Sequence, residues 1–219
     1  VGTQSFVASI KTGSNKYKKL IKEGKFIASS LSISDSDKTI ALRGNTAKHP
    51  NEVFIVRSKK AQRLTDSNTW LNDKRFAKQQ TISLKARDGV EIDGVLVYPL
   101  DYSEGTRYPL IMSVHGGPES HDKDGWITNY SRPGQMGAAR GYAVFYPNYR
   151  GSTGKGVDYS KLGQNDYAGK EFDDLVDFKN HLVDMGLVDT KRVGITGGSY
   201  GGYASAWAAT KLTKHFAAS

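Results

Sequence analysis

The sequence contains no cysteine in its 219 residues. This absence excludes disulfide bonds, thiolate zinc sites and cysteine nucleophiles, and it leaves the compartment open between cytoplasm, periplasm and secretion. No apolar run approaches the roughly 20 residues that span a bilayer, so we expect no membrane span. The sequence also lacks an initiator methionine and a cationic apolar leader, and we expect the native N-terminus to lie upstream of Val1.

Acidic residues are scarce in the first part of the chain, where the net charge of +9 is concentrated. Residues 1–80 carry 16 Lys and Arg against 6 Asp and Glu, whereas residues 81–219 carry 15 against 16. A basic half can indicate a nucleic acid or an anionic surface as partner. No nucleic-acid-binding motif accompanies it, so we expect a solvated lysine-rich face and no nucleic-acid partner. The densest lysine run comprises Lys16, Lys18, Lys19 and Lys22.

Residues 1–80 are typical of short antiparallel strands separated by turn-prone pieces. The spacing of the β-prone segments fits a sandwich or a propeller blade. A closed propeller needs about four to eight blades, and this stretch has room for roughly one and a half. We therefore expect only part of a propeller here. The predicted strands are residues 5–10, 26–31, 39–43 and 52–56.

Residues 81–219 alternate strand and helix patterns, which predicts a largely parallel α/β sheet. An apolar stripe with helical spacing predicts a helix over residues 167–185, with Asp173, Asp174, Asp177 and Lys179 facing outward. Small residues predict a second helix from about Gly201. The predicted strands are residues 94–99, 109–115, 141–147 and 192–197, of which 109–115 is apolar on both faces and should lie inside the sheet.

A G-x-S-x-G motif, Gly197 to Gly201, joins the last of these strands to the second helix. In this context the motif places a nucleophile on a sharp, strained turn with its hydroxyl exposed, and Ser199 is that residue. The N–H groups that follow, beginning with Tyr200, would face a developing oxyanion. We expect the neighbouring glycines to be required because a Cβ would strike the adjacent strand or helix. The weaker alternative is a glycine-rich turn that binds phosphate or only packs tightly.

A second glycine motif follows the strand 109–115: His115, Gly116, Gly117 and Pro118. In α/β-hydrolases a loop of this type, placed after an early strand, supplies the other oxyanion N–H. It precedes the strand–turn–helix at Ser199, called the serine elbow below, and this is the order that such enzymes require.

Three motifs together resemble the prolyl oligopeptidase family of serine peptidases, in its acylaminoacyl-peptidase and dipeptidyl-peptidase-like branch. They are residues 115–118 (HGGP), 148–152 (NYRGS) and 198–203 (GSYGGY). The resemblance implies an α/β fold: residues 81–219 as the N-terminal part of an α/β-hydrolase (peptidase) domain, and residues 1–80 as the C-terminal fragment of a β-propeller.

The family resemblance also assigns roles. It implies hydrolysis of short peptides, with no cofactor and no metal. Ser199 is the nucleophile, and the Tyr200 N–H and the loop His115, Gly116 and Gly117 form the oxyanion hole. Tyr149 and Arg150 support that loop. Some members have a tyrosine at the His115 position whose hydroxyl contacts the oxyanion, and we do not transfer that side-chain role to histidine.

The general base is not evident in the sequence. The triad of this fold runs Ser, Asp or Glu, then His along the chain. The residues after Ser199 include one histidine, His215, and no Asp or Glu. Sixteen helical residues would separate the two by about 20 Å, so His215 is not the base. We expect the catalytic acid and histidine beyond Ser219, and therefore an inactive fragment.

Other interpretations stay open or are weaker. The segment 150–156 lacks the glycine spacing and the final Ser or Thr of a phosphate loop. His121, Asp122 and Asp124 lie too close in sequence to form a metal cage. A carboxylesterase has the same elbow, and a non-catalytic hydrolase-like module would lack part of the triad. The sequence does not distinguish aminopeptidase, dipeptidyl-peptidase and endopeptidase, nor does it give the oligomeric state.

Overall fold

The computed structural model describes residues 2–36 and 39–219, so Val1 lies outside it. Contacts divide the chain into two compact units. The first contains residues 3–74 and 123–126, and the second contains residue 2 with residues 75–122 and 127–219.

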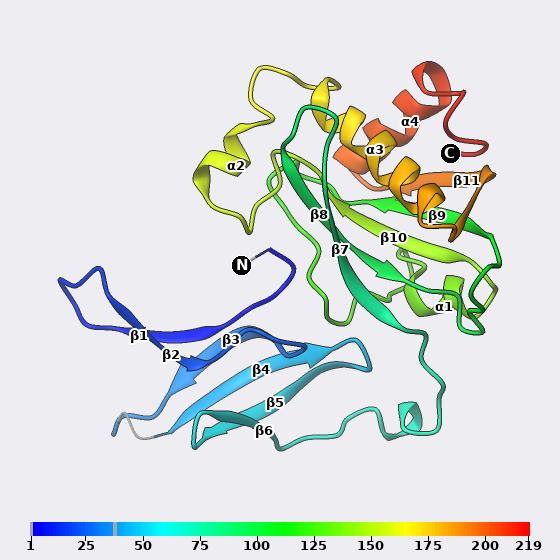
Figure 1. The fold of residues 1–219 in the computed structure, drawn as a ribbon. Helices are drawn as coiled ribbons and strands as arrows, with labels where there is room; N and C mark the ends of the chain where they lie inside the picture. Colours follow the sequence, from blue (N-terminus) through cyan, green and yellow to red (C-terminus); the bar gives the residue numbers. More distant parts are fainter. Residues whose placement is uncertain (1, 37–38) are drawn as a thin grey trace. The chain divides into compact units, whose positions relative to one another are not determined.

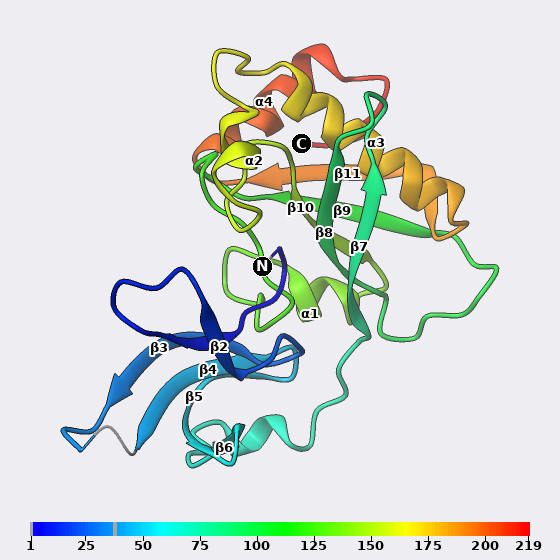
Figure 2. The ribbon, with the colours of Figure 1, turned by 60° about the vertical axis from the view of Figure 1, so that its left-hand side comes forward.

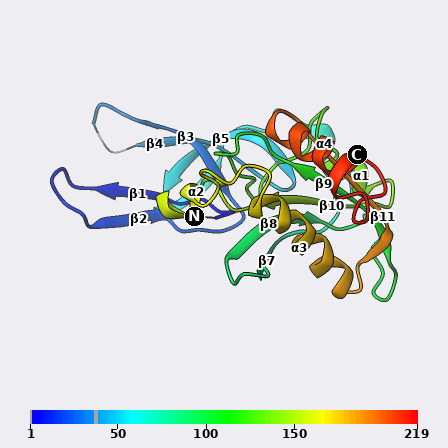
Figure 3. The same cartoon turned by 90° about the horizontal axis from the view of Figure 1, so that it is seen from above.

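The first unit consists of antiparallel strands (Figure 1 and Figure 3). Strands β1 (Val7–Ile10) and β2 (Tyr17–Ile21) form a hairpin. A four-stranded sheet follows in sequence order, as in a propeller blade. Its strands are β3 (Ile27–Ile33), β4 (Ile40–Thr46), β5 (His49–Arg57) and β6 (Lys60–Arg63), and a 3-10 turn, η1, covers Thr69–Leu71.

The four strands predicted in this unit are confirmed, but two others were not predicted. The lysine run was interpreted only as a solvated face, yet it forms much of β2. Ile21 pairs with Val7 and Tyr17 with Ile10, so backbone pairing to β1 makes a strand of a lysine-rich segment. The side chains of Lys16 and Lys18 remain exposed.

The second unit contains a five-stranded mixed sheet. Its strands are β7 (Gln79–Lys85), β8 (Glu91–Val97), β9 (Tyr108–Val114), β10 (Ala143–Asn148) and β11 (Val188–Gly197), in the order β11-β9-β10-β8-β7. Strand β9 lies inside the sheet, as predicted, and pairs in parallel with β10 and β11. The pairs β7–β8 and β8–β10 are antiparallel. The prediction of a parallel sheet therefore holds only for the three strands next to the serine elbow.

Helices cover both faces of this sheet (Figure 2). Helices α3 (Lys170–Asp184) and α4 (Tyr200–Lys211) pack on one face over Leu96, Met112 and Phe145. The short helix α1 (Gly134–Ala138) packs on the other face, and α2 (Val157–Lys161) lies in the loop after β10. Both predicted helices are confirmed as α3 and α4. Within the described residues, no helix is long and apolar enough to cross a membrane.

One prediction for α3 was wrong: Asp174 and Lys179 are buried rather than outward-facing. Asp174 is buried because Arg150, 3% exposed and just beyond β10, lies against it. The Arg150 Nη2 atom lies 2.7 Å from Asp174 Oδ1, and Nη1 lies 2.6 Å from Asp88 Oδ2. This guanidinium holds the pKa of Asp88 well below its usual range. Arg150 thus joins β10, the β7–β8 turn and α3.

A second arginine, Arg87, connects the β7–β8 turn to α3 at the surface. Arg87, half-exposed, lies 2.8 Å from Asp177 and 3.2 Å from Asp173, both on α3. Each arginine forms ion pairs with two aspartates, but the Arg150 side chain is buried and the Arg87 side chain is half-exposed.

This difference predicts unequal effects on stability. Arg150→Ala should lower the free energy of unfolding by about 3–5 kcal/mol, because it leaves the Asp174 charge buried without a partner. Arg87→Ala should cost at most about 1 kcal/mol, because Arg87 and Asp173 are about half exposed and Asp177 keeps the backbone N–H of residue 87 as a donor. Urea unfolding of the full-length protein compares the two variants. Equal losses would contradict the account of α3 docking.

Candidate active site

The predicted serine elbow has the expected shape. Strand β11 ends at Gly197, as predicted, and α4 begins at Tyr200, one residue before the predicted start. Between them Ser199 has φ +56° and ψ −120° and is exposed. A positive φ is uncommon for a residue with a side chain and stores strain at functional sites. The turn therefore presents the Ser199 hydroxyl to solvent.

Two of the four neighbouring glycines are required by close packing. A Cβ on Gly197 would lie 2.8 Å from Gly201 Cα and would also collide with Val114 O. A Cβ on Gly201 would lie 2.9 Å from the Val114 carbonyl carbon and closer to its oxygen. Gly198 faces open space, and a Cβ on Gly202 would make only an ordinary contact, 3.5 Å from Gly197 O. The expectation that every neighbouring glycine is required to avoid a clash is therefore confirmed for Gly197 and Gly201 and wrong for Gly198 and Gly202.

The loop His115-Gly116-Gly117, called the HGG loop below, lies directly beside the elbow. Val114, the last residue of β9, pairs with Gly197, the last residue of β11. The HGG loop and the elbow therefore begin side by side, at the C-terminal ends of two neighbouring parallel strands. A Cβ on Gly116 would lie 3.1 Å from Ser199 Cβ and 3.6 Å from Ser199 Oγ. Gly117 has φ +126°. The backbone of this loop is thus the group that approaches the serine hydroxyl.

The His115 side chain turns away from Ser199 into the protein. Its Nδ1 lies 2.8 Å from Gly116 O, and because a carbonyl only accepts, Nδ1 carries the proton. In the neutral ring Nε2 then accepts from the Ser152 hydroxyl at 2.9 Å. Burial lowers the pKa of His115, which favours this neutral form. With both nitrogens engaged, His115 is not positioned to deprotonate Ser199.

Tyr149 lies between the HGG loop and the serine elbow and contacts a residue of each. Its ring stacks on His115 at 4.5 Å and lies 6.3 Å from the ring of Tyr200. Its hydroxyl donates to His115 O at 3.0 Å, and burial raises the pKa of Tyr149 well above its usual value. Tyr149 thus supports the HGG loop directly. Its neighbour Arg150 makes ion pairs with Asp88 and Asp174 and donates its backbone N–H to Asp174.

Sequence reasoning missed one buried residue at the site, Glu171, which is 2% exposed. The Tyr200 hydroxyl donates to Glu171 Oε1 at 2.6 Å. A signal was available in the sequence. Glu171 precedes Leu175, Phe178 and Leu182 on the apolar stripe of α3, so helical spacing directs it inward.

His215 lies beyond the far end of the helix that the elbow starts. Helix α4 has 12 residues and ends at Lys211, which corresponds to a length of about 18 Å. The N–H of His215 bonds to Leu212 O in the turn after the helix. The prediction that His215 is remote from Ser199 agrees with this geometry.

The residues weighed for a metal site have other partners. His121 Nδ1 lies 2.8 Å from Thr153 Oγ1, and Asp122 forms an ion pair with Arg132. In residues 2–36 and 39–219, no group of three or more His, Asp or Glu side chains is placed to hold a metal ion. In the segment 150–156, Lys155 Nζ donates to Glu91 O at 2.9 Å, which ties that lysine to β8.

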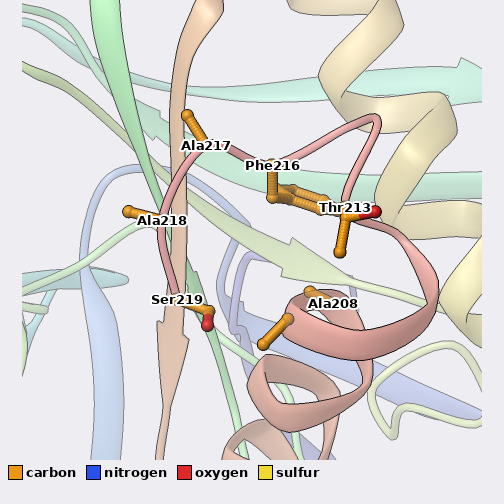
Figure 4. A pocket seen from close by; sticks show the side chains of 7 residues that line it. Ala208, Thr213, Phe216, Ala217, Ala218 and Ser219 are labelled. Atoms are coloured by element: carbon orange, nitrogen blue, oxygen red, sulfur yellow. The ribbon is translucent and has the colours of Figure 1, made fainter.

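A pocket of about 410 Å³ lies at the C-terminal end of α4 (Figure 4), whereas Ser199 precedes the first residue of that helix. Ala208, Phe216 and Ala218 line it, with Ser219 at its edge. The segment beside it runs along β11: Ala217 N donates to Val193 O, and Ile195 N donates to Ala218 O. Four alanines and one phenylalanine line this pocket together with Thr213 and Ser219, and Ser199 is not among the lining residues, so the pocket is not the candidate active site.

Comparison with known proteins places this geometry in a family. Residues 128–219 match the profile of the prolyl oligopeptidase family. The chain is 33% identical over 186 residues to an uncharacterised peptidase of Bacillus subtilis (strain 168), YuxL, covering 81% of this chain and 27% of that protein. It is 38% identical over 141 residues to dipeptidyl aminopeptidase BIII of Pseudoxanthomonas mexicana, covering 62% of this chain and 20% of that protein. The chain thus spans about a quarter or less of these relatives.

A solved structure of acylaminoacyl peptidase in complex with Z-Gly-Gly-Phe-chloromethyl ketone superposes with a TM-score of 0.77 and 26% identity. The match covers 95% of this chain and 36% of that one. It confirms the predicted fold class, an α/β-hydrolase domain preceded by propeller strands. The sequence and structural matches confirm the resemblance that the three motifs indicated, and residues 128–219 of the chain match the prolyl oligopeptidase family.

Proposed function

We propose that the full-length protein is a serine peptidase that hydrolyses short peptides through an acyl-enzyme on Ser199. The observation that carries this proposal is the exposed hydroxyl of Ser199, on a turn with φ +56°, beside the backbone of Gly116. The peptidases among the relatives support the substrate class.

The chemistry begins with attack of Ser199 Oγ on a peptide carbonyl carbon, which places negative charge on the carbonyl oxygen. Two kinds of backbone donor surround that position. Tyr200 supplies an N–H from the first turn of α4, where a helix leaves its N–H groups without intrahelical partners. Gly116 or Gly117 supplies the second N–H from the loop after β9. The amine then leaves, and water hydrolyses the acyl-enzyme.

The proposal needs a histidine to take the Ser199 proton and a carboxylate to orient that histidine. Neither His115, which bonds to Ser152 and Gly116, nor His215, beyond α4, fits this role. The triad order of the fold places the acid and then the histidine after the serine. We therefore assign both to sequence that follows Ser219.

The domain assignment belongs to the same proposal. Residues 81–219 would form the catalytic domain, and residues 1–80 would contribute to a propeller that restricts access to short peptides. The sequence-ordered antiparallel sheet β3 to β6 supports the propeller assignment.

Replacing the nucleophile tests the proposal. In the full-length protein, Ser199→Ala should lower kcat for an aminoacyl or dipeptidyl nitroanilide by on the order of 10⁶-fold, because no acyl-enzyme can form. Ser205→Ala is the control: it removes a hydroxyl from the same helix that only bonds to Gly201 O, and activity should persist. Undiminished turnover by Ser199→Ala would refute the assignment. Turnover of the matching nitrophenyl ester alone would indicate an esterase instead.

The elbow glycines give a second test. Gly201→Ala should destabilise the protein by about 3 kcal/mol and reduce labelling of Ser199 by a fluorophosphonate, because the new Cβ collides with Val114 O. Gly202→Ala should be neutral or slightly stabilising, by up to about 1 kcal/mol, since alanine favours helix. Melting curves and labelling rates compare the pair. Equal tolerance of both changes would contradict the packing described for the elbow.

A further inference from the structure

The side chain of Tyr200 is partly buried and packs against the core of the second unit. Its hydroxyl donates to Glu171 Oε1 at 2.6 Å. Its ring lies 5.7 Å from Phe172 and 6.3 Å from Tyr149. Burial raises the pKa of Tyr200 well above its usual value, and the bond to Glu171 raises it further. The hydroxyl therefore stays protonated and remains a donor.

Glu171 is itself held rigidly. It is 2% exposed and lies in the first turn of α3. Its Oε1 also accepts the N–H of Ala168 at 2.5 Å, and Oε2 accepts the N–H of Gly169 at 3.1 Å. Ala168 has φ +60°, so the carboxylate stabilises a strained turn as well as the tyrosine. Three donors thus fix one buried carboxylate.

Tyr200 is also the residue whose N–H follows the nucleophile. It is the first residue of α4, so its side chain and its N–H leave the same short turn. The hydroxyl anchor and the helix together restrict the Cα of Tyr200, and with it the peptide that joins Tyr200 to Ser199.

We infer that Glu171 is a positioning residue, which acts through the Tyr200 hydroxyl to aim the Tyr200 N–H at the oxyanion. This inference rests on the proposed function, because it needs Ser199 to be the nucleophile. Loss of an oxyanion donor costs about 10²–10³-fold in kcat. A donor that is misaligned but present should cost less, about 10- to 100-fold.

Three variants of the full-length protein test the inference. Tyr200→Phe removes only the hydroxyl, Glu171→Gln removes the charge, and the third variant combines both changes. Each single change should lower kcat by about 10- to 100-fold per fluorophosphonate-titrated site, with KM within about threefold. The double variant should lose no more than the worse single variant, because both changes act on the same hydrogen bond: Gln replaces one of the two accepting oxygens of Glu171 by an NH2 donor, and Phe removes the hydroxyl that donates. Asp173→Asn, on an exposed face of the same helix, is the control and should leave kcat unchanged.

Inhibitor binding separates positioning from general loosening. Affinity for a peptide aldehyde, which forms an oxyanion on the enzyme, should fall in Tyr200→Phe by the same factor as kcat. Affinity for a peptide that forms no adduct should not change. Unchanged kcat in Tyr200→Phe, or additive losses in the double variant, would overturn the inference. If Ser199→Ala is inactive at the same time, the proposed function still stands. Full activity of Ser199→Ala would remove the proposed function itself.

Discussion

The close approach of the serine elbow to the end of β9 is the constraint on which the rest of the site depends. Gly197 and Gly201 both lie against the Val114 carbonyl, with no room for a Cβ. That contact holds β11 and α4 so near to β9 that the next residues of the β9 loop reach Ser199. Nucleophile and candidate oxyanion donors are brought together by the absence of side chains, and the strained φ of Ser199 accompanies this packing.

Buried polar groups then fix the elements around this contact. Arg150 attaches α3 to the β7–β8 turn through Asp174 and Asp88. Once α3 is docked, Glu171 in its first turn meets Tyr200 in the first turn of α4. Tyr149 fills the space between Tyr200 and His115. The two loops of the proposed oxyanion hole are therefore supported by one continuous set of contacts rather than by two independent ones.

The sequence predicted those features of the fold that depend on residues close together along the chain. The elbow, the HGG loop, β9 and the two helices all followed from residue type and spacing within about twenty residues. Features that depend on distant partners did not. Strand β2 exists because its backbone pairs with β1, which a lysine-rich run does not reveal. Asp174 is buried because Arg150 reaches it from 24 residues away. The inward direction of the His115 ring depends on Ser152, 37 residues on.

The central claim is that Ser199 Oγ and the backbone donors around it form one reactive site. A crystal structure of the full-length protein after reaction with a fluorophosphonate tests this most directly. The account predicts phosphorus bonded to Ser199 Oγ, with a phosphoryl oxygen about 2.7–3.1 Å from Tyr200 N and from Gly116 N or Gly117 N. An adduct on another residue, or a phosphoryl oxygen directed away from these amides, would contradict it.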